Sequence, residues 1–278
     1  MNVKKNESFE IFVCLFVWSI FCTYASSAQS VRTISKDTVP LKSYYVCKTK
    51  QPMVIDGKLD DPAWRKAKWT NKFMDIEGPY KPAPLYNTRV KMLWDSNYLY
   101  IAAELEEPNI WATLTQYDDI IFRDHDFEVF LDPNNDGNQY FEIEINALGT
   151  IMDLFMFKSY KKGGPMNMGW NATGIKTAIG IDGTLNDNRD TDKKWIVEMA
   201  IPYSCLNKPG RNYLPQIGMP WRINFSRVEW TLEKSGVEYV KKLQNNGKPI
   251  PEFNWVWSAM GLIDMHVPER WGYLYFKE

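Results

Sequence analysis

Apolar and polar residues alternate with a period of two along most of the chain after residue 87. This alternation is typical of strands that bury one face, and Asp, Asn, Gly and Pro separate the segments as turn residues do. The predicted strands are residues 88–95, 97–107, 126–132, 139–146, 150–158, 174–181, 193–202, 221–230, 254–260 and 271–277. The pattern therefore predicts an all-β fold, an antiparallel β-sandwich with jelly-roll character and few short helices.

The chain before residue 88 has a different pattern. Residues 29–50 lack strong periodicity and predict a tether or an edge strand. Asp61-Pro62, followed by Ala63 and Trp64, predicts a short helix with proline in its first turn. Two long loops, residues 161–170 and 235–251, carry Gly, Pro and Lys and are candidates for shaping a site.

The first 28 residues have the features of a secretory signal peptide. Lys4 and Lys5 precede an apolar stretch, residues 11–24, that is too short to span a bilayer comfortably, and Ala28 offers a small residue for cleavage. We therefore expect an exported protein, periplasmic or secreted, whose main domain covers residues 51–278. No later stretch predicts a membrane span.

The net charge and the tryptophan content bear on which ligands the protein binds, and the cysteines bear on whether it contains a disulfide. A formal net charge of -1 gives no electrostatic reason to expect nucleic acid as a partner. Twelve Trp residues are more than a core alone needs, and exposed Trp is one means of holding sugar rings. Cys47 and Cys205 could form a disulfide after export, or both could be separate buried thiols.

Polar side chains share one face of three predicted strands, because alternate residues of a strand point to opposite sides. That face holds Asp126, Glu128, Glu142, Glu144, Asn146, Arg222, Asn224 and Ser226. It could be a water-facing surface with cross-strand ion pairs, or a platform whose carboxylates and amides bind sugar hydroxyls. Glu128 and Glu144 could also be the two carboxyls of a glycoside hydrolase.

The segment between residues 132 and 137 resembles half of a calcium-binding loop. Asp132, Asn134 and Asp136 have the spacing of its first three ligands, and calcium is the metal that these oxygens suit. However, its twelfth position would be Ile143, and the residues equally suit a hairpin turn. We expect no obligatory cofactor, with calcium as the candidate if one binds.

Several segments occur in an order that resembles the carbohydrate-binding module family 9-like domains of exported bacterial proteins. They are IDGKLDDPAW, WDSNYLYIAAEL, DHDFEVFLDPNNDGNQYFEIEINALGT, KWIVEMAIPYSCL, WRINFSRVEW and WVWSAMGLIDMHVPERWGYLYF. The resemblance implies a β-sandwich that binds sugar. It also implies that two Trp side chains clamp the sugar, polar residues of one sheet bond it, and calcium supports the loops.

The family's clamp positions differ in this chain. The first falls at residues 122–125 and the second at residues 264–266, and neither place has a Trp. His125 and His266 stand there instead, so the resemblance places both at one site rim. They could contact sugar, bond to a loop carbonyl or a neighbouring Asp, or ligate haem or a metal together with Met265.

The residues and the resemblance together predict non-catalytic carbohydrate binding that serves polysaccharide or glycan breakdown, beside polysaccharide-degrading enzymes as partners. The alternatives are a hydrolase that uses Glu128 and Glu144, and a haem or metal domain that uses the histidines. Trp170 and Trp111 are the preferred stacking residues. The predicted ligand-binding residues are Glu128, Glu144, Asn146, Asn224, Arg227, His125, His266, Trp170 and Trp111.

Overall fold

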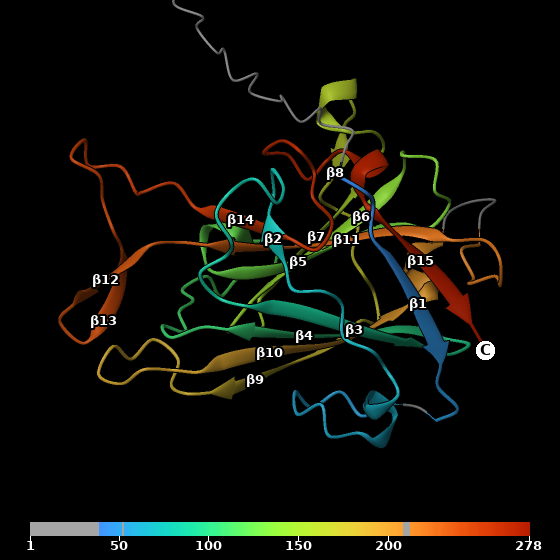
Figure 1. The fold of residues 1–278 in the computed structure, drawn as a ribbon, viewed down its shortest axis with the longest axis horizontal. Helices are drawn as coiled ribbons and strands as arrows, with labels where there is room; N and C mark the ends of the chain where they lie inside the picture. Colours follow the sequence, from blue (N-terminus) through green and yellow to red (C-terminus); the bar gives the residue numbers. More distant parts are fainter. Residues whose placement is uncertain (1–38, 52, 208–211) are drawn as a thin grey trace, which may run out of the picture. The chain divides into compact units, whose positions relative to one another are not determined.

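A computed structural model describes residues 39–51, 53–207 and 212–278 (Figure 1). The chain divides into two units, residues 1–35 and 36–278, and all described residues belong to the second. The predicted signal peptide lies outside the described residues. No helix in the described part is long and apolar enough to cross a membrane.

The strands account for nearly all regular structure in the described residues. They are β1 Ser43–Lys48, β2 Met74–Asp75, β3 Thr88–Trp94, β4 Tyr98–Glu106, β5 Asp126–Asp132, β6 Tyr140–Asn146, β7 Ile151–Met156, β8 Met166–Asn167, β9 Lys176–Asp182, β10 Lys194–Pro202, β11 Trp221–Glu229, β12 Leu232–Ser235, β13 Glu238–Lys241, β14 Phe253–Val256 and β15 Gly272–Lys277. The helices are short: η2 Pro62–Arg65, η3 Ile121–Arg123, η4 Tyr160–Lys162, α1 Tyr203–Leu206 and η5 Pro268–Arg270.

Thirteen strands form one continuous sheet that curls so that its two halves face each other (Figure 1). The order is β8-β7-β6-β5-β11-β15-β1-β3-β4-β10-β9, with β14 paired to β11 and β2 paired to β14. The main core lies between the halves: Phe127 and Ile143 from one half meet Ile101 and Val197 from the other in one buried cluster. All-β structure and mostly antiparallel pairing confirm the predicted fold class.

One strand differs from its predicted position. Residues 43–48, expected in a tether or at an edge, form β1 in the sheet interior, where it pairs in parallel with both β15 and β3. Tyr44 and Val46 are the buried side chains of β1 and alternate with exposed ones. Two inward side chains are too weak a periodic signal to distinguish an interior strand from an edge strand.

The long loops contain structure that the sequence pattern did not predict. The loop expected at residues 235–251 begins with the β12–β13 hairpin, and the loop expected at residues 161–170 contains η4 and β8. These pieces are two to four residues long, below the length at which alternation is informative. The helix predicted after Asp61 is present as η2, with Trp64 buried.

The polar face of β5, β6 and β11 is covered rather than open to water. A second apolar cluster lies on that face, with Phe130, Tyr140 and Leu154 from the sheet packing against Met265 and Trp271. Among the polar residues of this face, Asp126, Asn146, Asn224 and Ser226 are all 0% exposed. The alternative of a water-facing surface is therefore wrong, and the covered face is where a site has to be sought.

The two cysteines of the described residues are separate thiols. Cys47 is exposed, whereas Cys205 is buried and its Sγ lies 3.0 Å from the carbonyl oxygen of Pro202. Burial raises the pKa of the Cys205 thiol to about 12. The predicted disulfide is absent, and the alternative of two separate thiols holds, although only Cys205 is buried.

Candidate functional site

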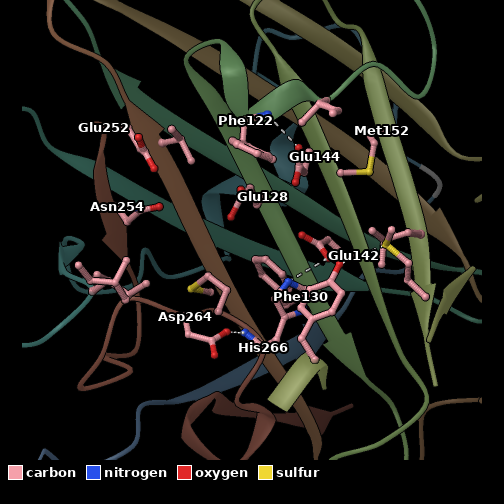
Figure 2. A pocket seen from close by; sticks show the side chains of 18 of the residues that line it. Phe122, Glu128, Phe130, Glu142, Glu144, Met152, Glu252, Asn254, Asp264 and His266 are labelled. Carbon is pink, nitrogen blue, oxygen red and sulfur yellow. Dashed lines mark hydrogen bonds and ion pairs between the residues drawn. The ribbon is translucent and has the colours of Figure 1, made fainter. Parts of the chain in front are cut away.

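A cavity of about 460 Å³ opens on the covered polar face, over β5, β6, β7, β11 and β14 (Figure 2). Figure 2 shows Glu252 and Asn254 on one side, Met152 on the other, and Glu128 and Glu144 between them. The lining residues are Ile76, Ile120, Phe122, Glu128, Phe130, Glu142, Glu144, Met152, Leu154, Tyr160, Met166, Met168, Val228, Glu252, Asn254, Ile263, Asp264, Met265 and His266. A cavity of this size and mixed lining suits a small organic ligand.

Carboxyl groups from two adjacent strands form the cavity floor. Glu128 on β5 pairs directly with Glu144 on β6, and Phe130 pairs with Glu142. Asp126 lies behind them, and oxygens of Asp126, Glu128 and Glu144 lie within 4.8 Å of one another. We call Asp126, Glu128, Glu142 and Glu144 the floor carboxyls.

Burial and mutual repulsion keep protons on the floor carboxyls. Burial raises the pKa of Glu128 to about 7. Burial raises the pKa of Glu144 well above its usual value, and the charges of Glu128, Asp126 and Glu142 raise it further. The pKa values of Asp126 and Glu142 are raised for the same two reasons. The floor can thus both donate and accept hydrogen bonds near neutral pH.

An aromatic side chain at the rim is tied to this floor. Phe122 lies in η3 and is 42% exposed, so its ring is available to a ligand at the cavity mouth. Its backbone N–H donates to Glu144 Oε2 at 3.0 Å. The Glu144 carboxyl therefore both lines the cavity floor and holds the backbone of Phe122 at the rim.

The opposite rim contains Tyr160 and His266, whose rings lie 4.5 Å apart between centroids. His266 Nδ1 is 2.9 Å from the hydroxyl of Tyr140, and its Nε2 is 3.9 Å from Glu142 Oε2. Burial lowers the pKa of His266 to about 4, so the ring is neutral at neutral pH. An ion pair of 2.9 Å between Asp264 and Lys161 links the two loops of this rim.

The structure brings only some of the predicted ligand-binding residues together. Glu128, Glu144 and His266 line the cavity. Asn146 does not, because its amide bonds to the carbonyl of Leu114 at 2.9 Å and to Asp124 at 3.0 Å. The Asn224 amide likewise donates to the Ser258 carbonyl oxygen and accepts from the Ser258 backbone N–H. Both amides hold loops against the sheet.

His125 and Arg227 belong to a different cluster, on the core face of β11. Arg227 is fully buried and its Nη2 lies 2.6 Å from Glu107 and 2.8 Å from Glu229. His125 is 1% exposed and lies 3.5 Å from Glu107 and 3.7 Å from Glu229. We call these four residues the arginine cluster. His125 therefore does not share a rim with His266, and the two-histidine arrangement that was considered for haem or metal is absent.

The two preferred tryptophans also lie away from this cavity. Trp170 packs on the main core, with its ring 4.8 Å from that of Phe141 and its Nε1 donating to Cys205 O at 3.1 Å. Trp111 is 6% exposed, with its ring 5.5 Å from that of His125, and lines a separate cavity of about 400 Å³. The sequence showed both residues near loops but gave no sign of which face they would occupy.

The proposed calcium residues form the turn between β5 and β6. Both oxygens of the Asp132 carboxylate accept backbone N–H groups, from Asn135 at 3.0 Å and Gly137 at 2.9 Å. Asn134 Nδ2 donates to Asp136 Oδ2. Among the described residues, the acidic groupings compact enough to hold a metal are elsewhere, in the floor carboxyls and in the arginine cluster. Calcium at residues 132–136 stays a prediction.

Sequence reasoning missed several cavity residues. Glu142 shares strand parity with Glu144, and this parity was the signal that could have added it to the predicted site. Asn254 begins the predicted strand at residues 254–260 but was not named as a site residue. Tyr160 and Glu252 lie beside long loops, where no periodic pattern could have placed them at the cavity.

Comparison with known proteins identifies the family. The family model described as carbohydrate family 9 binding domain-like matches residues 55–231. The chain belongs to this family. The matched region contains β5, β6 and β11 and so all four floor carboxyls, whereas Asn254 and His266 lie beyond it.

Relatives of this family 9-like domain include enzymes and sugar-bound modules. The exoglucanase XynX of Acetivibrio thermocellus is 30% identical over 157 residues, which are 55% of this chain but only 12% of that enzyme. A family 9 carbohydrate-binding module from Caldicellulosiruptor kristjanssonii in complex with glucose covers 85% of this chain and 96% of its own, at 18% identity and TM-score 0.51. A family 9 module from the same organism in complex with cellotriose covers 85% of this chain and 94% of its own, at 18% identity and TM-score 0.52. These structures share the fold.

Proposed function

We propose that this domain binds carbohydrate in the cavity over the floor carboxyls and does not change it chemically. The observation that carries the proposal is the combination of an exposed Phe122 at the mouth with Glu128, Glu144 and Asn254 inside. A sugar ring has an apolar C–H face that packs on an aromatic ring, and hydroxyls that donate to carboxylates and amides. Family membership supports the same ligand class.

The sugar would enter with one ring over Phe122 and its hydroxyls toward the floor. Since the relatives include an exoglucanase, we further propose that the domain serves polysaccharide or glycan breakdown beside degrading enzymes, in the periplasm or outside the cell. Glycoside hydrolysis needs one of its two carboxyls to be ionised, whereas burial raises the pKa of both Glu128 and Glu144 and no Lys or Arg lines the cavity to favour their ionised forms. This favours binding over hydrolysis.

Calorimetric titration with glucose, cello-oligosaccharides and xylo-oligosaccharides tests the proposal. Phe122→Ala should weaken sugar binding roughly tenfold, because it removes the stacking surface and leaves the floor intact. The matched control is Phe157→Ala: Phe157 is 45% exposed and does not line the cavity, so its loss should leave affinity unchanged.

Two outcomes would contradict the proposal. Absence of binding to every plant, host and bacterial glycan would refute carbohydrate binding. Release of reducing sugar that disappears in Glu128→Gln or Glu144→Gln would show hydrolysis instead.

A further inference from the structure

The lining of the cavity carries acidic groups without basic partners. Five lining residues are acidic, namely Glu128, Glu142, Glu144, Glu252 and Asp264, and none of the lining residues is Lys or Arg. Outside the lining, Lys161 pairs with Asp264 at the rim. His266 is the basic side chain of the lining, and it is neutral at neutral pH because burial lowers its pKa. The floor itself therefore has no counter-charge from the lining.

Two floor oxygens also lack the hydrogen bonds that buried oxygens normally make. Asp126 Oδ2 and Glu142 Oε2 are buried and have no hydrogen-bond partner among the described residues. The other oxygen of Asp126 accepts the backbone N–H of Val228 at 2.9 Å. An unpaired buried polar atom costs about 1–3 kcal/mol. Glu142 lines the cavity and Asp126 does not, so a ligand that donates to Glu142 Oε2 recovers that cost.

Charge and hydrogen-bond demand together identify the missing group as a cationic donor. An ammonium group donates three hydrogen bonds and carries one positive charge, which matches a floor of closely spaced carboxyls. The cavity walls are mainly apolar, with Met152, Leu154 and Met265 among them. Apolar walls suit an organic ligand better than a metal ion that keeps part of its water shell.

We propose that the cavity selects a sugar that carries a free amino group, with its ammonium against Glu128, Glu142 and Glu144. This inference rests on the proposed carbohydrate binding and names the class of sugar. The ring of such a sugar packs at Phe122 while the ammonium lies on the floor. An N-acetylated sugar has the same ring but no charge, and is therefore the matched comparison.

The experiment is calorimetric titration of the whole chain with three ligands of one size. They are a fully deacetylated chitosan trisaccharide, the N-acetylated trisaccharide and cellotriose. The amino trisaccharide should bind roughly tenfold more tightly than either neutral one, because hydrogen bonds between charged groups exceed neutral ones by about 1 kcal/mol or more. Glu142→Gln should reduce this preference to about threefold or less, whereas Glu233→Gln, an exposed residue of β12, should leave it unchanged.

Proton release gives a readout on the wild-type protein alone. The ammonium lowers the pKa of the floor carboxyls, so binding at pH 5.5, where the free amino sugar is already charged, should release protons and make the measured heat depend on the ionisation enthalpy of the buffer. Tyr140 and Tyr160 face the floor with raised pKa values and His266 with a lowered one, so they keep their charge states at this pH. Neutral trisaccharides should show no such dependence.

Each result distinguishes this inference from the proposed function. Equal affinity for the amino and N-acetylated sugars would overturn the amino-sugar inference and leave carbohydrate binding in place. Absence of all sugar binding would overturn both. Binding of calcium chloride that is lost in Glu128→Gln, without binding of the amino sugar, would show that the floor is a metal site instead.

Discussion

Two groups of buried acidic side chains lie on opposite faces of β5 and β11, and the chain neutralises only one of them. In the arginine cluster, the Arg227 guanidinium bonds to Glu107 and Glu229, to the backbone carbonyl of Glu106 and to the hydroxyl of Thr88. Burial and Glu229 raise the pKa of Glu107, but Arg227 acts in the opposite direction. Both carboxyls of this cluster therefore have a cationic partner inside the fold, although His125 Nδ1 has no hydrogen-bond partner among the described residues.

The floor carboxyls have no such cation. They receive backbone N–H groups, from Phe122 to Glu144 and from Val228 to Asp126, and the charges that act on Glu144 come from other carboxyls. Buried like charges destabilise the fold, and binding sites commonly carry this kind of cost. The comparison indicates that the arginine cluster serves stability, and it agrees with our proposal that a ligand supplies the partner of the floor carboxyls.

The largest effect should follow from removing the cation of the arginine cluster. Arg227→Met leaves Glu107 and Glu229 buried without a counter-charge and should lower the free energy of unfolding at pH 7 by about 3–5 kcal/mol. Urea unfolding measures this change. Lys58→Met is the control, because Lys58 pairs with Asp56 at the surface and should not matter measurably. An Arg227→Met protein as stable as wild type would contradict the claim that Arg227 is needed to neutralise Glu107 and Glu229.

Removing a charged group from the floor carboxyls should stabilise the fold, in contrast to removing Arg227 from the arginine cluster. Glu128→Gln removes one buried acid and should raise the free energy of unfolding at pH 8 by about 3 kcal/mol, since the pKa of Glu128 is raised from 4.5 to about 7 in the fold. In wild type, this group costs the fold no stability below pH 4.5, where it is protonated in both states. The cost appears as pH rises above 4.5 and is complete once pH exceeds 7.

The stabilisation by Glu128→Gln should therefore be absent at pH 4.5, grow between pH 4.5 and 7, and be constant above that range. Urea unfolding at pH 4.5, 6 and 8 checks the profile. The control is Glu233→Gln at the exposed β12, which should show no such growth. A Glu128→Gln protein that is less stable than wild type at pH 8 would mean that the ionised carboxyl is compensated in the fold.

The strand pattern predicted the floor but not the groups that cover it. Alternation placed Glu128, Glu142 and Glu144 on one face, and the structure confirms that they share it, because strand parity is a local property. Arg227 was in the predicted ligand set, yet it has the strand parity of Ile223 and Phe225 and lies on the core face. Its true partners, Glu107 and Glu229, were outside the predicted site, and pairing Arg227 with Glu107 required the topology of the curled sheet.

The rim could not be derived from periodicity for a different reason. Tyr160 and His266 meet because two loops that are distant in sequence are joined by the Lys161–Asp264 ion pair. Loops carry no repeating pattern, so their contacts depend on side-chain geometry that a single sequence does not display. The resemblance placed His125 and His266 on one rim, but only His266 lines the cavity, whereas His125 lies in the arginine cluster on the core face.

The smallest effect on binding should come from the residue that sequence reasoning preferred for stacking. Trp170 lies on the core face of β6, where its Nε1 donates to Cys205 O, so Trp170→Phe should lower the free energy of unfolding by about 1 kcal/mol. Its sugar affinity should stay within about twofold of wild type, in contrast to Phe122→Ala, which acts on the cavity face. Thermal melts and calorimetric titration of both variants measure the two quantities. A tenfold loss of sugar affinity in Trp170→Phe with unchanged stability would place the ligand on the core side of the sheet and reverse the assignment of the two faces.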